Sequence, residues 1–205
     1  MNSMLGKLIA ALMLLLVPFG LFAQSEEELP DLRNQIGLVF TMTETGSGLG
    51  GFIAWPLIGK IHMGFNLDAW FLRDSRQIDF QYYGTPLSIN KQNNVYLFDA
   101  MLTFKRRFFE DDLDESFRPF ISGGVGPYFG MNFPEDDPNP EAEPRADEYR
   151  WTLGGFVGVG VDVTVNEKVF VGIRGQYRVI PFKETLGERS NHSMFELRFE
   201  IGRRY

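Results

Sequence analysis

Apolar and charged side chains alternate almost without interruption through the C-terminal residues 193–205. A β-strand turns successive side chains to opposite faces, so a two-residue period predicts a strand whose two faces differ. The segment therefore predicts a terminal strand with one apolar face and one ionic face, ending on an aromatic residue. Its apolar positions are Phe195, Leu197, Phe199, Ile201 and Tyr205, and its charged positions are Glu196, Arg198, Glu200 and Arg204.

The N-terminus has the pattern of an export signal. Lys7 precedes an apolar run at residues 8–22, and the small residue Ala23 follows it, before a polar stretch. This order is typical of a secretory signal peptide. A membrane anchor is the alternative, but the run is shorter than the roughly 20 residues a spanning helix needs and contains Pro18. We expect a signal peptide at residues 1–23, a polar leader at 24–33 and one β-barrel domain at 34–205.

Composition narrows the class of the exported domain. The chain has no cysteine, which excludes a disulfide framework, a thiolate metal site and a lipid-modified cysteine. No later stretch approaches about eighteen uninterrupted apolar residues, so no membrane helix is predicted. The formal net charge of −7 argues against nucleic acid as a partner.

Seven other segments also read as strands, most of them alternating clearly, and with the terminal one they give eight. An even count allows both termini to lie on one side of a membrane. One connection, residues 73–94, carries Ile78, Phe80 and Tyr82 at alternate positions, which predicts a hairpin ribbon outside the barrel. The predicted strands are 35–42, 49–55, 61–72, 95–106, 117–130, 151–164, 169–179 and 193–205.

Alternation alone does not distinguish a membrane barrel from a soluble one. Both have the same two-residue period, but the apolar face lies outside in a membrane barrel and inside in a soluble one. The strand lengths match those of tilted strands that cross a bilayer. The connections 43–48, 73–94, 131–149 and 181–192 are longer on average than 56–60, 107–116 and 165–168, as in membrane barrels. Aromatic residues near strand ends predict girdles: Trp55, Phe104, Tyr128, Trp151 and Tyr205. The predicted fold is all-β, an eight-stranded antiparallel transmembrane up-and-down β-barrel.

Charges of both signs lie on neighbouring polar faces, with Arg174 and Arg178 beside Glu196 and Glu200. The interior of an eight-stranded barrel is narrow, and buried ions need partners. We therefore predict a luminal charge network with a structural role. Its members are Asp68, Asp99, Asp162, Arg174, Arg178, Glu196, Arg198 and Glu200.

Several stretches resemble the small outer-membrane β-barrel family of Gram-negative bacteria, typified by the OmpA barrel, OmpX and OmpW-like proteins. They are residues 118–126 (RPFISGGVG), 154–162 (GGFVGVGVD) and 176–178 (QYR), with the terminal Tyr205. The resemblance implies an outer-membrane location, contact with membrane lipid and lipopolysaccharide, and insertion by the barrel assembly machinery, which reads the final strand. Phe199, Ile201 and Tyr205 are then the assembly signal. Arg203 departs from the pattern, because it places a charge on the lipid-facing side.

Candidate catalytic residues lie at 190–193. His192 and Ser193 with Glu196 contain the residue types of a nucleophilic triad. Some small barrels are lipid A-modifying enzymes, but their deacylase pattern places His and Ser two residues apart on one face. Here the two are adjacent, so we expect polar loop residues and no catalysis.

Candidate ligand sites are equally weak. His62 with Asp68 and Asp99 suggests a metal, but a lone luminal histidine is more often a hydrogen-bonded filler. The acidic segments 134–143 and 110–115 lack the spacing and glycine of a calcium loop. The glycine clusters 123–126 and 154–160 lack the lysine and helix of a phosphate loop and are predicted to be packing positions in strands.

The sequence therefore predicts a non-enzymatic, monomeric outer-membrane barrel with a structural or surface-interaction role through its extracellular loops, without catalytic residues, cofactor or metal. A narrow OmpW-like conduit for ions or small hydrophobic molecules is the alternative. A lipid A-modifying rim enzyme is a third, less favoured possibility.

Overall fold

The computed structural model of the chain describes residues 33–58, 61–73, 78–82, 85–89, 93–108, 117–134 and 145–205. The predicted signal peptide and all but the last residue of the polar leader lie outside these ranges. Among the described residues, no helix is long and apolar enough to cross a membrane.

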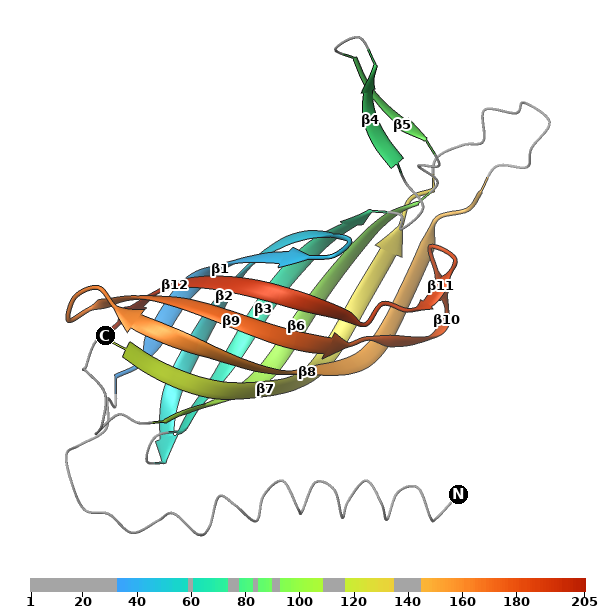
Figure 1. Cartoon of the computed structure of the whole chain (residues 1–205). Coiled ribbons are helices and arrows are strands. Elements are labelled where there is room, and N and C mark those ends of the chain that lie inside the picture. The colour runs from blue at the N-terminus through green and yellow to red at the C-terminus, as the bar shows by residue number, and fades with distance from the viewer. Residues whose placement is uncertain are drawn as a thin grey trace, which may run out of the picture. The chain divides into compact units, whose positions relative to one another are not determined.

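Eight of the described strands close into one antiparallel barrel in the order β1-β12-β9-β8-β7-β6-β3-β2, which confirms the predicted fold (Figure 1). The first and last strands close the barrel, because β1 pairs with β12 from Gln35↔Arg204 to Thr43↔Glu196. The strands are β1 (Gln35–Thr43), β2 (Gly46–Ile58), β3 (Ile61–Arg73), β6 (Asn94–Arg107), β7 (Phe117–Asn132), β8 (Glu148–Thr164), β9 (Val169–Val179) and β12 (Met194–Arg204).

Two small sheets lie in connections between barrel strands. β4 (Ile78–Tyr82) and β5 (Thr85–Ile89) form the ribbon predicted within residues 73–94. β10 (Pro181–Leu186) and β11 (Arg189–Asn191) form a second hairpin inside the predicted loop 181–192. The sequence did not predict this second hairpin.

Several strand boundaries differ from the prediction, and β2 begins at Gly46, inside the predicted connection 43–48. β2 continues through Pro56 to Ile58 with a register shift, because a bulge lets proline remain in a strand. β7 and β8 extend into the predicted loop 131–149, where Asn132 pairs with Glu148. β6 includes Arg107, which the sequence assigned to a turn. Backbone pairing needs only a partner strand, so it continues beyond the apolar pattern.

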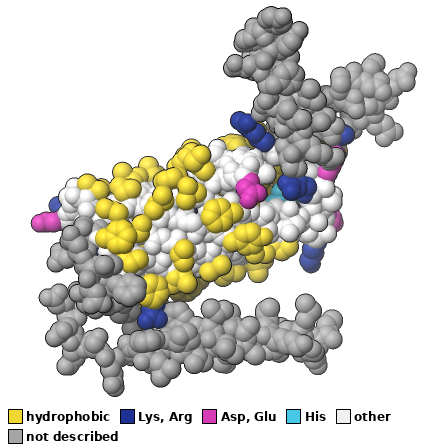
Figure 2. Space-filling model, viewed as in Figure 1, with side chains coloured by type: hydrophobic (Ala, Val, Ile, Leu, Met, Phe, Trp, Pro, Cys, Tyr) yellow, Lys and Arg dark blue, Asp and Glu magenta, His cyan; other side chains and the backbone are white. Residues whose placement is uncertain are grey.

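The two faces of the wall differ as the alternation predicts. On β1, Leu38 is 68% exposed on the outside, whereas its neighbour Val39 is 3% exposed on the inside. On the face shown in Figure 2, hydrophobic side chains cover the barrel wall, and most charged side chains lie toward its two ends. The predicted girdle residue Tyr128 is an exception, because its even position on β7 turns it into the interior, where it is fully buried.

We call the end of the barrel where β1 begins and β12 stops the terminus end. There the Tyr205 amide donates a hydrogen bond to the Asn34 carbonyl over 3.0 Å. The opposite end, which carries the β1–β2 turn and the β10–β11 hairpin, is the loop end.

A charge placed on the outer wall tests whether this wall faces lipid. Leu38→Arg, at mid-strand, should lower the free energy of unfolding in phospholipid vesicles by about 2–4 kcal/mol, because arginine is costly at the bilayer midplane. Ile36→Arg, on the same face but near the terminus end, should cost only about 0–1 kcal/mol. Denaturant titration measures both, and equal costs would contradict a membrane-spanning wall.

Candidate functional site: the barrel interior and its mouth

Arg178 on β9 is the centre of the interior charge cluster. Its Nε donates a hydrogen bond to Glu196 Oε2 over 2.6 Å. Its Nη1 donates to Asp99 Oδ2 over 2.5 Å and to Tyr128 Oη over 2.7 Å. Asp68 Oδ2 lies 3.5 Å from Nη2. One guanidinium thus connects β3, β6, β7 and β12 across the barrel.

A second layer of charges lies toward the terminus end. Arg198 donates to Asp68 Oδ2 over 2.6 Å and to Glu200 Oε1 over 3.0 Å. Glu200 also pairs with Arg174, whose Nη2 lies 3.0 Å from its Oε1. Asp68 and Glu200 are therefore shared acceptors that join neighbouring cations.

Lys105 and Arg107 on β6 extend the cluster. Lys105 Nζ lies 3.2 Å from Asp162 Oδ1 and 3.3 Å from Glu200 Oε2. Arg107 Nη2 lies 3.3 Å from Asp162 Oδ2. The ion pairs thus run without a break from Arg107 to Asp99. The structure brings all eight charges of the sequence-predicted network into this cluster and adds Lys105 and Arg107.

Aromatic rings complete the surroundings of the cations. The Arg178 guanidinium lies 4.3 Å from the Trp70 ring centroid, and Lys105 Nζ lies 4.1 Å from that of Phe120. Such contacts favour a cation most where water is excluded. Tyr128, predicted to lie in the outer girdle, instead faces the lumen and is fully buried. Its even position on β7, shared with Gly126 and Gly130, was the sequence signal for this facing.

An apolar layer lies above the charges at the loop end. Ile180, Phe182 and Leu186 from the β10–β11 hairpin region are buried in one cluster with barrel residues. The barrel residues of the cluster are Trp70, Leu72, Val95, Leu97, Met101, Tyr128, Phe156 and Met194. The hairpin therefore acts as a cap that closes the mouth of the barrel.

The cap has a defined turn and polar attachments. Leu186 pairs with Arg189, so Gly187 and Glu188 form a two-residue turn, with φ values of 55° and 65°. Positive φ at both central residues is the type I′ geometry of tight hairpins. The Gly187 amide donates to Glu148 Oε2 over 2.6 Å, which holds the turn against β8.

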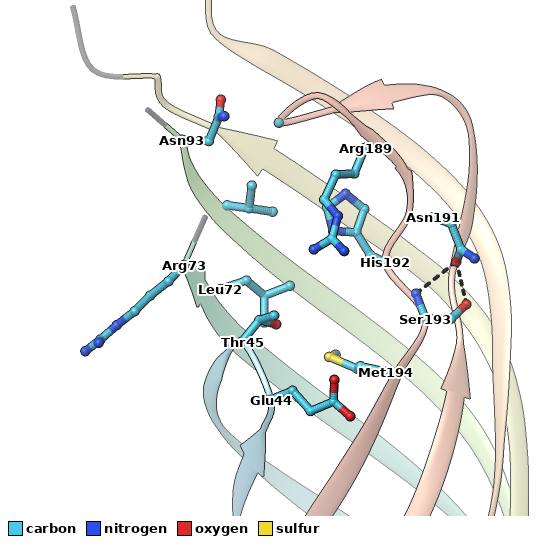
Figure 3. A pocket seen from close by; sticks show the side chains of 12 residues that line it. Glu44, Thr45, Leu72, Arg73, Asn93, Arg189, Asn191, His192, Ser193 and Met194 are labelled. Atoms are coloured by element: carbon cyan, nitrogen blue, oxygen red, sulfur yellow. Dashed lines mark hydrogen bonds between the residues drawn. The ribbon is translucent and has the colours of Figure 1, made fainter. Parts of the chain in front are cut away.

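His192 and Ser193 help to hold the cap. His192 Nε2 hydrogen-bonds to the Leu186 carbonyl over 3.0 Å, and its ring meets Phe182 edge-on. Ser193 Oγ donates to Asn191 Oδ1 over 2.6 Å (Figure 3). Glu196 bonds to Arg178 inside the barrel. These bonds do not form the relay of a catalytic triad, in which serine, histidine and carboxylate contact one another.

The other sequence candidates fall into two groups. His62 is buried, but Asp68 and Asp99 bond to arginines, and the described residues contain no group of three side chains suited to a metal. Residues 110–115 and nearly all of 134–143 lie outside the described residues. The glycine clusters lie in β7 and β8, and a Cβ on Gly154 would meet the Tyr128 ring at 2.6 Å, which supports their packing role.

The interior is not filled throughout. A small hollow of about 20 Å³, room for about one water molecule, remains in its terminus half. Its lining includes Gln35, His62, Asn66, Lys105 and Glu200. The charged and capping layers therefore separate this hollow from the loop end.

The architecture is shared with solved outer-membrane proteins. The N-terminal β-barrel domain of Pseudomonas aeruginosa OprF has 12% identity over 86% of this chain and 100% of that one, with a TM-score of 0.55. OprG from the same organism has 14% identity over 86% and 97%, with a TM-score of 0.52. Neisserial surface protein A has 12% identity over 83% and 94%, with a TM-score of 0.50.

Neither the protein-family models nor the curated protein sequences give a match to this chain. The likeness to solved structures is therefore one of fold. The chain has the fold of the small eight-stranded outer-membrane β-barrels, as its sequence resemblance predicted. Within that fold, the interior of this chain holds the ion-pair cluster and the apolar cap.

Removal of the central cation tests the cluster. Arg178→Met should lower the free energy of unfolding by about 3–5 kcal/mol, because Asp99 and Glu196 would remain buried without their partner. Adding Asp99→Asn and Glu196→Gln should recover much of the loss, since the uncompensated charges are gone. Denaturant titration in vesicles measures both; a triple variant no more stable than the single one would contradict this role.

Acid should loosen the cap. Burial lowers the pKa of His192 below its ordinary value of 6.5, and the positive Arg189 nearby adds to this; the Leu186 hydrogen bond and Glu148 oppose it. Because the pKa of His192 is lower in the folded protein, neutral His192 stabilises the docked cap above about pH 6.5. This contribution to stability is lost as the pH falls below that value. Hydrogen-exchange protection of residues 180–193 should therefore drop between about pH 7.5 and about pH 5.

His192→Gln is the control for this pH effect, because glutamine can donate to the Leu186 carbonyl but does not titrate. The variant should lose most of the pH dependence of protection. An unchanged dependence would assign the effect to other groups.

Proposed function

We propose that the protein is a closed, non-enzymatic outer-membrane β-barrel with a structural or surface-interaction role through its outer loops. The observation that carries the proposal is the double closure of the interior. Arg178 and its three carboxylates occupy the cross-section, and the cap residues Phe182 and Leu186 cover them at the mouth. Ions passing through would have to disrupt both layers.

The proposal includes the location and the assembly of the barrel. The exported barrel inserts with its loop end outward, in contact with membrane lipid and lipopolysaccharide. The barrel assembly machinery reads β12, and Phe199, Ile201 and Tyr205 provide the signal. Support comes from the outward exposure of Phe199 and Ile201 on β12, the strand that closes the barrel, and of Tyr205 directly after it. The barrel works as a monomer, since β1 and β12 complete each other within one chain.

Absence of catalysis is part of the same proposal. The polar groups at the mouth that resemble catalytic residues are engaged in holding the cap: His192 with Leu186, and Ser193 with Asn191 and Ile180. A rim enzyme would need a nucleophile and a base in contact. No nucleic acid, cofactor or metal is required for the proposed role.

Planar-bilayer recording tests the proposal. The purified, folded chain should insert, as shown by heat-modifiable gel migration and protease protection, without steady single-channel conductance. A steady conductance that persists in several preparations would contradict closure and favour a narrow conduit.

A further inference from the structure

A hollow at the loop end lies beside the cap and opens over the lowest part of the rim. Its cavity volume is about 70 Å³, and it is partly open to solvent. Glu44 and Thr45, which join β1 to β2, line one side, and Arg189 and His192 of the cap region line another. Figure 1 shows the β1–β2 turn stopping short of the level that β7 and β8 reach.

The floor of the hollow is apolar and closed. Leu72, Val95 and Met194 line it, and each belongs to the buried cluster that seals the mouth. The hollow is therefore a blind notch in the rim, which a ligand can enter but not pass through.

Arg189 is the cation available to a ligand there. Its side chain extends into the notch, whereas that of Arg73 extends away from it (Figure 3). Among the described residues no carboxylate pairs with Arg189, in contrast to Arg174, Arg178 and Arg198 of the interior. An exposed guanidinium without a carboxylate partner favours an oxyanion, and its fork of donors suits phosphate.

The wall below the notch is apolar and exposed. Met42 on β1 and Leu49 on β2 are 51% and 59% exposed, and Phe195 on β12 is 52% exposed. In a bilayer, acyl chains would cover these side chains, and the short β1–β2 turn would place the notch beside their headgroups.

We propose that this notch binds a phosphate monoester carried by a membrane lipid, with Arg189 as its anchoring cation. The proposal rests on the membrane insertion proposed above. The apolar floor takes the glycerol or sugar part of the lipid next to the phosphate, and Glu44 at the rim opposes the anion and limits its affinity.

Native mass spectrometry of the full barrel in detergent, with phosphatidic acid as the probe, tests the proposal. Arg189→Ala should weaken binding at least about tenfold, as expected for loss of a charge-assisted hydrogen bond. Lys183→Ala removes an exposed cation of the same hairpin that does not line the notch, and should leave affinity unchanged. Glu44→Gln should tighten binding.

Two further arms identify the source of the phosphate. Phosphatidylcholine should bind much more weakly, because its phosphate is a zwitterionic diester. Saturable binding of inorganic phosphate with the same Arg189 dependence would retain the site and assign it to a soluble phosphate instead. Equal losses in Arg189→Ala and Lys183→Ala, or no preference for phosphatidic acid, would overturn the proposal.

Heat-modifiable gel migration and bilayer insertion are measured for each sample. They show whether a negative binding result concerns the notch alone or the proposed function as well. A barrel that inserts but shows no Arg189-dependent binding overturns the notch alone. A chain that does not insert overturns the proposed function as well.

Discussion

The Arg178 guanidinium lies in a space too narrow for a hydration shell, so its charge has to be balanced by protein groups. Asp68, Asp99 and Glu196 supply that balance from three other strands. Each carboxylate would itself be unstable without the arginine. Arg178 and its carboxylate partners are thus stable only together. Strand register determines whether they meet, because a one-residue slip of a strand would turn its partner side chain outward.

The cap and the charges depend on each other. Tyr128 connects the two layers, since its hydroxyl accepts from Arg178 while its ring packs within the apolar cluster. The hairpin that supplies Phe182 and Leu186 excludes water from the loop end, which strengthens the ion pairs below it. Under the proposed function, the closed mouth leaves the outer loops and rim, rather than the lumen, as the surface on which this protein acts.

The sequence predicted most of the barrel because period-2 alternation is a direct consequence of strand geometry. The even position numbers of these alternating strands were enough to predict that four charged side chains share the luminal side: Arg174, Arg178, Glu196 and Glu200. The cap could not be predicted this way, because its turn uses Gly187-Glu188, which lacks the asparagine-glycine signal of a type I′ turn. Arg107 was missed because the acidic residues after it suggested a turn. The notch could not be predicted because Glu44 and Arg189 lie far apart in the sequence and come together only in the folded barrel.

Closure of the barrel requires that the interior be sealed from water at the level of Arg178. Proton exchange of the arginine Nε–H groups, measured by NMR in lipid nanodiscs, tests it most directly, with Arg189 at the rim as an internal reference. If the interior is sealed, the Arg178 Nε–H, bonded to Glu196, exchanges far more slowly than that of Arg189. Exchange at equal rates would show that water reaches the centre of the barrel and that the interior is not sealed.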